Sequence, residues 1–81
     1  SGLIRVMERA ARKAGGRLRR DFGEVEHLQV SRKGPADFVS KADMRAERTL
    51  YDELSAARPG WGFVMEEAGV IEGDPGMPRW I

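Results

Sequence analysis

Residues 40–67, SKADMRAERTLYDELSAARPGWGFVMEE, contain the signals of a helix start, a helix stop and a strand in immediate succession. Ser40 and Asp43 have the spacing of an N-terminal capping box, so we expect a helix to begin here. Apolar residues then recur at helical spacing as far as Ala57, and Pro59-Gly60 stops the pattern. The stretch therefore predicts one amphipathic helix that ends at a turn.

The apolar run after this turn predicts a short buried strand. Residues 63–65, Phe-Val-Met, are consecutive apolar residues, and Glu66 and Glu67 follow at the C-terminal end of the strand. Glycine and proline recur between positions 69 and 78, which we expect to form a loop. Residues 80–81, Trp-Ile, then begin another apolar run, which predicts a further strand.

A second amphipathic helix is predicted over residues 3–22. Apolar residues recur there at helical spacing, and Arg and Lys residues occupy many of the positions between them. Gly15-Gly16 lies inside this helix and predicts a kink or a close helix contact, since each glycine costs about 1 kcal/mol relative to alanine. Gly23 is expected to cap the C-terminus of the helix.

The segment between the two helices is predicted to be mostly extended. Residues 26–32 are expected to form a strand, Gly34-Pro35 to break it, and residues 37–39 to be extended or loop-like. The chain would then hold two amphipathic helices and about three short strands. The expected fold class is α+β or layered α/β, in one partial domain without a linker.

The composition excludes several classes of protein. At 81 residues the chain allows one small domain at most. It has no cysteine, which excludes disulfides and thiolate metal sites, and its single histidine, His27, excludes a multi-histidine zinc site within one copy. No apolar stretch approaches the ~20 residues of a membrane helix, and no secretory signal pattern opens the chain. We therefore expect a cytoplasmic protein without a membrane partner.

The net charge of +1 conceals an asymmetry between the two parts of the chain. Residues 1–33 carry nine Lys and Arg against four Asp and Glu, whereas residues 34–81 carry five against nine. A basic first part could contact nucleic acid, and an acidic second part could hold cations. A solvated basic helix face is the more common explanation of the first observation. Arg17, Arg19 and Arg20 lack the interleaved aromatic residues of a nucleic-acid surface.

Four acidic residues are candidates for metal chemistry: Asp37, Asp43, Glu66 and Glu67. Mg²⁺ binds through a few carboxylates together with water and substrate phosphate, and a metal-dependent hydrolase needs such groups in one cleft. The alternative is structural, with Asp43 as a helix cap and the Glu pair as a solvated strand end. The spacing alone leaves both interpretations open.

Three motifs in the correct order resemble the inositol monophosphatase family, in particular its bacterial members, along essentially all 81 residues. Residues 37–43 match the pattern D-x-V-(S/T)-x-x-D, and residues 63–67 match F-x-x-E-E. Residues 80–81 match a W-I that leads, in the family, into an aspartate-rich D-P-(L/I)-D-G-T segment. Met65 departs from the pattern, because family members usually carry glycine or another small residue before the Glu pair.

The resemblance implies a role for individual residues. Glu66 matches a glutamate that ligates magnesium ions and helps to position the attacking water. Asp43 matches an aspartate that orients a threonine hydroxyl of the D-P-x-D-G-T segment, so that the threonine can accept a proton from that water. Lys33 and Asp37 match the region of a mobile loop near the active site, and Glu67 is a secondary acidic candidate. The implied reaction is hydrolysis of an inositol phosphate or related sugar phosphate by metal-activated water, with Mg²⁺ as the cofactor.

The D-P-x-D-G-T segment would follow Ile81 almost immediately and is absent from the 81 residues. In the family it carries two further metal-binding aspartates and the threonine. We therefore expect residues 1–81 to be the N-terminal segment of a single larger domain and to be inactive alone. Uncovered helix faces, together with the tendency of the family to dimerise, also predict a homodimer or oligomer. Its interface would bury four apolar residues, Leu3, Met7, Leu50 and Leu54.

A rival interpretation is a small interaction module whose basic first helix binds RNA or a protein. Bacterial relatives of the family are in some cases linked to RNA and transcription factors, which supports this alternative. The parent reading frame discriminates between the two. A D-P-x-D-G-T continuation favours the enzyme, whereas a stop codon directly after Ile81 favours the module.

Overall fold

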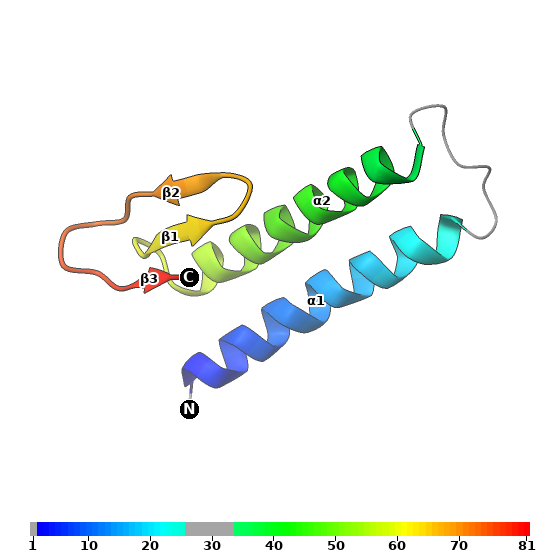
Figure 1. Ribbon diagram of the computed structural model, residues 1–81. Coiled ribbons are helices and arrows are strands. Elements are labelled where there is room, and N and C mark those ends of the chain that lie inside the picture. The colour runs from blue at the N-terminus through cyan, green and yellow to red at the C-terminus, as the bar shows by residue number, and fades with distance from the viewer. Residues whose placement is uncertain (1, 26–33) are drawn as a thin grey trace.

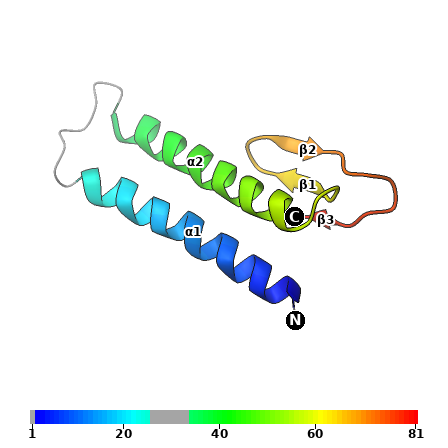
Figure 2. The same cartoon turned by 180° about the vertical axis from the view of Figure 1, so that it is seen from behind.

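The computed structural model describes residues 2–25 and 34–81 and consists of two long helices and a small sheet. Helix α1, Gly2–Val25, and helix α2, Gly34–Ala57, lie side by side and antiparallel (Figure 1). The three strands lie beside the C-terminal part of α2, and the view from behind gives the same arrangement (Figure 2). The two predicted amphipathic helices are therefore present.

Helix α1 is slightly longer than the sequence predicts. It runs through Gly15-Gly16, and a Cβ atom added at either glycine would meet nothing within 4 Å, so the pair makes no close helix contact. Gly23 lies inside α1 and does not cap it. The packing of one helix face against α2 outweighs the unfavourable helix propensity of these glycines, because tertiary contacts supply most helical stability in proteins.

Helix α2 begins at Gly34, six residues before the predicted start at Ser40. Pro35 falls in the first turn, where its missing N–H removes no helical hydrogen bond and its fixed φ already suits a helix. The predictions of a capped start at Ser40 and of an extended segment at 37–39 are therefore wrong. The strand predicted over 26–32 lies outside the described residues.

Alanines form the contact between the two helices. Ala10, Ala14 and Ala42 are 1%, 5% and 0% exposed, so the helices approach each other through their smallest side chains. Ion pairs flank this contact: Lys13 of α1 pairs with Glu53 of α2, and the Arg45 Nε atom lies 3.1 Å from Asp21 Oδ2. These contacts fix α2 against α1 along its length.

The sheet has the strand order β2-β1-β3 and is mixed. Strand β1, Gly62–Met65, pairs antiparallel with β2, Gly69–Ile71, and parallel with β3, Arg79–Trp80. The strands expected at 63–65 and 80–81 are thus present, but β2 falls where we predicted only a loop. Gly69, with a φ of +74°, supplies the left-handed conformation that closes the hairpin after the turn at residues 66–68.

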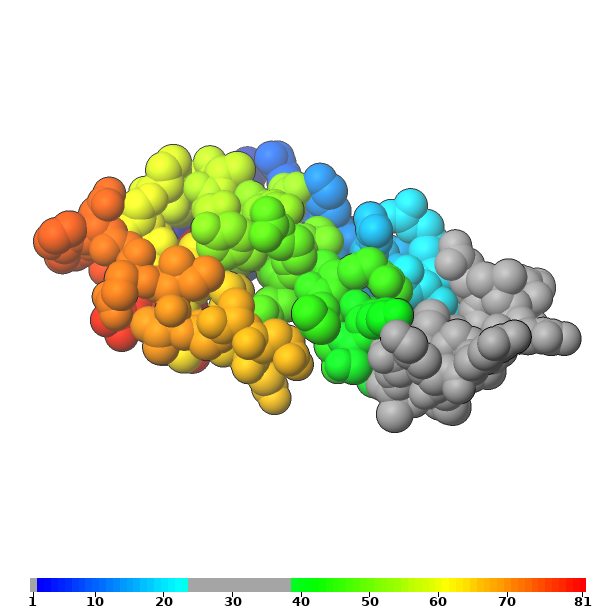
Figure 3. Space-filling model, turned by 90° about the horizontal axis from the view of Figure 1, so that it is seen from above, coloured from blue at the N-terminus to red at the C-terminus, as the bar shows by residue number. Residues whose placement is uncertain are grey.

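Aromatic rings join the sheet to α2. Phe63 of β1 is 3% exposed, and its ring lies 4.8 Å from that of Tyr51 on α2, centroid to centroid. On β3, the Trp80 ring lies 4.9 Å from that of Trp61. The space-filling view shows the strands, in yellow to red, at one end of an elongated molecule (Figure 3). The position of β1 relative to α2 therefore depends on the packing of Phe63 against Tyr51.

Candidate functional site

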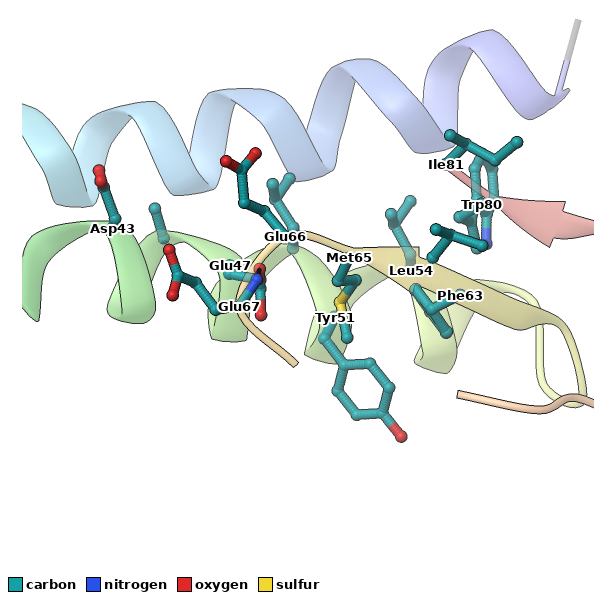
Figure 4. Close-up of a pocket in the computed structure, with 13 residues that line it drawn as sticks. Asp43, Glu47, Tyr51, Leu54, Phe63, Met65, Glu66, Glu67, Trp80 and Ile81 are labelled. Atoms are coloured by element: carbon teal, nitrogen blue, oxygen red, sulfur yellow. Dashed lines mark hydrogen bonds between the residues drawn. The ribbon is translucent and has the colours of Figure 1, made fainter. Parts of the chain in front are cut away.

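A pocket of about 490 Å³ lies between α2 and the sheet. Its walls are mostly apolar side chains of α2, β1 and β3, and four carboxylates stand among them (Figure 4). Those carboxylates belong to Asp43, Glu47, Glu66 and Glu67. Three of the four acidic residues singled out in the sequence thus share one cavity.

Asp43 belongs to this pocket and not to a helix cap. Because α2 begins at Gly34, Asp43 lies well inside the helix, where backbone N–H groups already have helical partners. Its side chain is exposed, and the structure gives it no hydrogen bond or ion pair among the described residues. The capping interpretation of Asp43 is therefore wrong, and its carboxylate is available to a ligand in the pocket.

Glu66 and Glu67 occupy the turn between β1 and β2, directly after the last residue of β1. Both are exposed, and neither side chain forms a hydrogen bond or ion pair within the described part of the chain. In Figure 4 the carboxylates of Glu66 and Asp43 rise on the same side of the pocket, whereas Tyr51 points the opposite way. The end of β1 and the face of α2 therefore bring Glu66 and Asp43 to one side of the cavity.

Glu47 is a residue of the site that the sequence patterns do not predict. Its Oε2 atom accepts a hydrogen bond from the Glu67 backbone N–H at 2.8 Å, and Oε1 accepts one from the Ala68 N–H at 3.0 Å. Glu47 stands four residues after Asp43 on α2, so the two share a helix face. That spacing is the one signal in the sequence that could have indicated Glu47.

Of the two residues predicted for a mobile loop, only Asp37 lies in the described part of the chain. Asp37 lies in helix α2, which contradicts the loop expected there, because Pro35 allows the helix to begin at Gly34. Lys33 lies outside the described residues.

The donor chemistry of the pocket suits a hard divalent cation, since carboxylate oxygens are the ligands that Mg²⁺ prefers. Within residues 2–25 and 34–81, however, no group of three or more acidic or histidine side chains is close enough to hold a metal ion. The described helices also include none with the length and apolarity to cross a membrane.

Comparison with known proteins decides the family. The sequence model described as "Inositol monophosphatase family" matches residues 1–81. The chain belongs to the inositol monophosphatase family.

Several relatives are similar to this family member over all or nearly all of its length. An inositol-1-monophosphatase of Mesorhizobium japonicum is 59% identical over 81 residues, and one of Rhizobium meliloti is 57% identical over the same length. The Nus factor SuhB of Escherichia coli is 30% identical over 98% of the chain. The chain spans about 30% of the length of each of these proteins.

A solved structure confirms the fold of this inositol monophosphatase family chain. The native crystal structure of extragenic suppressor protein suhB from Bartonella henselae superimposes with a TM-score of 0.76 at 54% identity. The match covers 98% of the chain and 31% of the suhB chain. The two helices and the mixed three-stranded sheet thus correspond to the N-terminal part of that fold, as predicted from the sequence.

Proposed function

We propose that the complete protein is a Mg²⁺-dependent phosphatase that hydrolyses inositol monophosphate or a related sugar-phosphate monoester. The observation that carries the proposal is that Asp43 of α2 and Glu66 at the end of β1 line one pocket. The names of the rhizobial relatives support the substrate class. The proposal includes the cytoplasm as the compartment, where sugar phosphates are found.

In this proposal the two carboxylates have different tasks. Glu66 supplies a charged oxygen ligand from the turn between β1 and β2, and Asp43 accepts a hydrogen bond from a hydroxyl group and so orients it. When bound, Mg²⁺ supplies the activation of a water molecule and neutralises charge on the phosphoryl oxygens. Leu50, Leu54 and Phe63 form an apolar wall of the same pocket, beside the two carboxylates.

We further propose that residues 1–81 form the N-terminal segment of a single larger domain. A polar group at the pocket supports this: the buried Trp80 indole N–H has no acceptor among the described residues. A buried donor without an acceptor costs free energy, so a further segment that supplies an acceptor would be stabilising. The ligands that complete the metal site would come from that segment.

Phosphate release from inositol 1-phosphate in the presence of Mg²⁺ tests the proposal. We expect turnover by the complete protein and none by the isolated 81-residue chain, because a single ligand holds Mg²⁺ weakly. Glu66→Gln in the complete protein should lose most of the turnover and remain folded, since it removes a charge but little volume.

The matched control for this experiment is Glu72→Gln. Glu72 is an exposed glutamate on the sheet side of the molecule, paired with Arg79 and outside the pocket. Its substitution should leave turnover unchanged. Near-normal turnover by the Glu66→Gln variant would show that the assignment of Glu66 is wrong.

The exposed basic residues of α1 favour a second candidate function, RNA binding. Arg17, Arg19 and Arg20 are on α1 and form no ion pair within the described part of the chain. The relatives named as Nus factors support this alternative. It predicts a gel shift of single-stranded RNA that weakens steeply as salt rises and is lost when all three arginines become glutamine. Absence of a shift at low salt would exclude it.

A further inference from the structure

The carboxylate of Glu47 holds the backbone of the turn that carries Glu66. Its two oxygens accept hydrogen bonds from consecutive N–H groups, those of Glu67 at 2.8 Å and Ala68 at 3.0 Å. Glu47 stands on α2, about 20 residues earlier in the sequence, so these are long-range contacts and not part of a local turn. Hydrogen bonds to an ionised acceptor are roughly twice as strong as those between neutral groups.

The sheet supplies no hydrogen-bond partner that would hold this turn in place. The pairing of Met65 with Gly69 leaves residues 66–68 outside the strand ladder. Their backbone N–H groups therefore have no partner from β1 or β2. A single side chain from α2 binds two of these groups at once, which fixes the position and the tilt of the turn relative to the helix.

The first of these hydrogen bonds acts on the peptide unit that follows Glu66. This unit joins the Glu66 carbonyl to the Glu67 nitrogen, so holding it restrains the backbone dihedral ψ of Glu66 and helps to set the direction of its side chain. Asp43 lies one helical turn before Glu47 on the same face of α2. The contact thus ties the Glu66 backbone to a point one turn away from Asp43.

We propose that Glu47 is a positioning residue, which holds Glu66 at a fixed place relative to Asp43 by binding the Glu67 and Ala68 amides. The proposal rests on the proposed phosphatase function. Both oxygens of Glu47 already accept N–H groups, so its task is to orient the turn and not to contact the substrate. Partners that orient a metal ligand in this way typically change metal affinity or activity by about 10- to 100-fold when they are removed.

The experiment compares Glu47→Ala and Glu47→Gln in the complete, Mg²⁺-loaded protein. Glu53→Gln is the control, because Glu53 is a half-buried glutamate of the same helix that pairs with Lys13 of α1, outside the pocket between α2 and the sheet. Three quantities are measured: hydrogen exchange at the Glu67 and Ala68 amides, Mg²⁺ affinity by calorimetry, and kcat with KM for inositol 1-phosphate.

We expect Glu47→Ala to speed exchange at both amides, to weaken Mg²⁺ binding by about 10- to 100-fold and to lower kcat far more than it raises KM. Glu47→Gln should give an intermediate loss, because its amide keeps one acceptor oxygen. Unchanged exchange in Glu47→Ala would refute the contact itself. Faster exchange with Mg²⁺ affinity and kcat equal to those of Glu53→Gln would reduce Glu47 to a structural role and overturn the proposal.

The arms of this experiment separate the two hypotheses. If the native complete protein releases no phosphate, the phosphatase proposal fails. Exchange and Mg²⁺ affinity still decide the role of Glu47, since neither depends on turnover.

Discussion

Alanine side chains are the residues on which the helix pair depends. Ala42 of α2 is completely buried, and Ala10 and Ala14 of α1 are nearly so. A methyl group at each of these positions lets the two backbones approach closely, and a longer side chain has no space unless the helices separate. The flanking Lys13–Glu53 ion pair is largely exposed on the lysine side and contributes little by comparison.

Ala42→Leu should therefore lower the free energy of unfolding of the complete protein by about 1–3 kcal/mol through overpacking. Ala11→Leu is the control, because Ala11 is exposed on α1, and we expect its effect to be within about 0.5 kcal/mol. Urea unfolding followed by circular dichroism measures both. Equal stabilities of the two variants would contradict the tight contact between the helices.

A different prediction concerns Asp43. Because this residue lies inside α2, its substitution should change activity and leave stability nearly unchanged. Asp43→Asn should lower phosphate release by the complete protein, since the amide is a poorer acceptor for an oriented hydroxyl than the carboxylate. The thermal midpoint should change little, because Asp43 is exposed and caps no helix. Asp52→Asn, an exposed position of the same helix, should leave turnover unchanged. A variant at Asp43 that is as active as the one at Asp52 would contradict the assigned role.

The sequence predicts Asp43 and Glu66 as site residues, and the structure places both at one pocket. The motif carries this prediction, since spacing alone leaves a structural role open. Glu47 cannot be predicted in the same way. Its partners are backbone N–H groups 20 and 21 residues away, and backbone groups leave no trace in the residue types of a sequence.

At the scale of the elements, the sequence predicts periodic segments well and boundaries poorly. Helix α1 follows its apolar period closely, and β1 follows its apolar run. The capping pattern at Ser40 is locally favourable, but the contact with α1 and the suitability of Pro35 for a first turn extend α2 to Gly34. The sequence does not predict strand β2, because its surroundings are rich in glycine, which is depleted in strands. The strand forms through its pairing with β1.

Gly69 provides a prediction at this scale. It adopts a φ of +74°, a conformation that costs an L-residue about 1–2 kcal/mol, although a Cβ there would meet no neighbouring atom. Gly69→Ala should thus destabilise the complete protein by about 1–2 kcal/mol through backbone strain alone. Gly15→Ala is the matched control: it adds the same methyl group in open space within α1 and should stabilise by up to about 1 kcal/mol. If both variants shifted the thermal midpoint in the same direction, backbone strain at Gly69 would not be the cause.

At the scale of the whole molecule, the chain is elongated, with extents of 47 × 25 × 14 Å. Leu3 and Met7 are 41% and 53% exposed on α1, and Leu50 and Leu54 are only half-buried in the wall of the pocket. An elongated shape buries little apolar area per residue, so the stability of the isolated chain depends on further contacts.

We therefore predict that the isolated 81-residue chain forms a dimer or larger oligomer at micromolar concentration, which buries these four side chains between copies. Sedimentation equilibrium measures the mass directly. Replacing Leu3 and Met7 by glutamine should shift the equilibrium towards the monomer, whereas the same change at the exposed loop residue Met77 should not. A compact, stable monomer of the unaltered chain would refute the prediction.

The parallel pairing of β3 with β1 gives the small sheet a further consequence. Phe63 stands opposite Trp80, so both strands direct their carboxyl ends to the same edge, about 4.8 Å apart. Side chains on a strand alternate between the two faces of the sheet. The register therefore determines on which face a given residue lies, as well as how far apart two residues are. In a longer protein, residues joined to Ile81 would begin one strand width from the segment that carries Glu66. The pairing of β1 with β3 would then determine whether a following carboxylate lies on the same face of the sheet as Glu66 or on the opposite face.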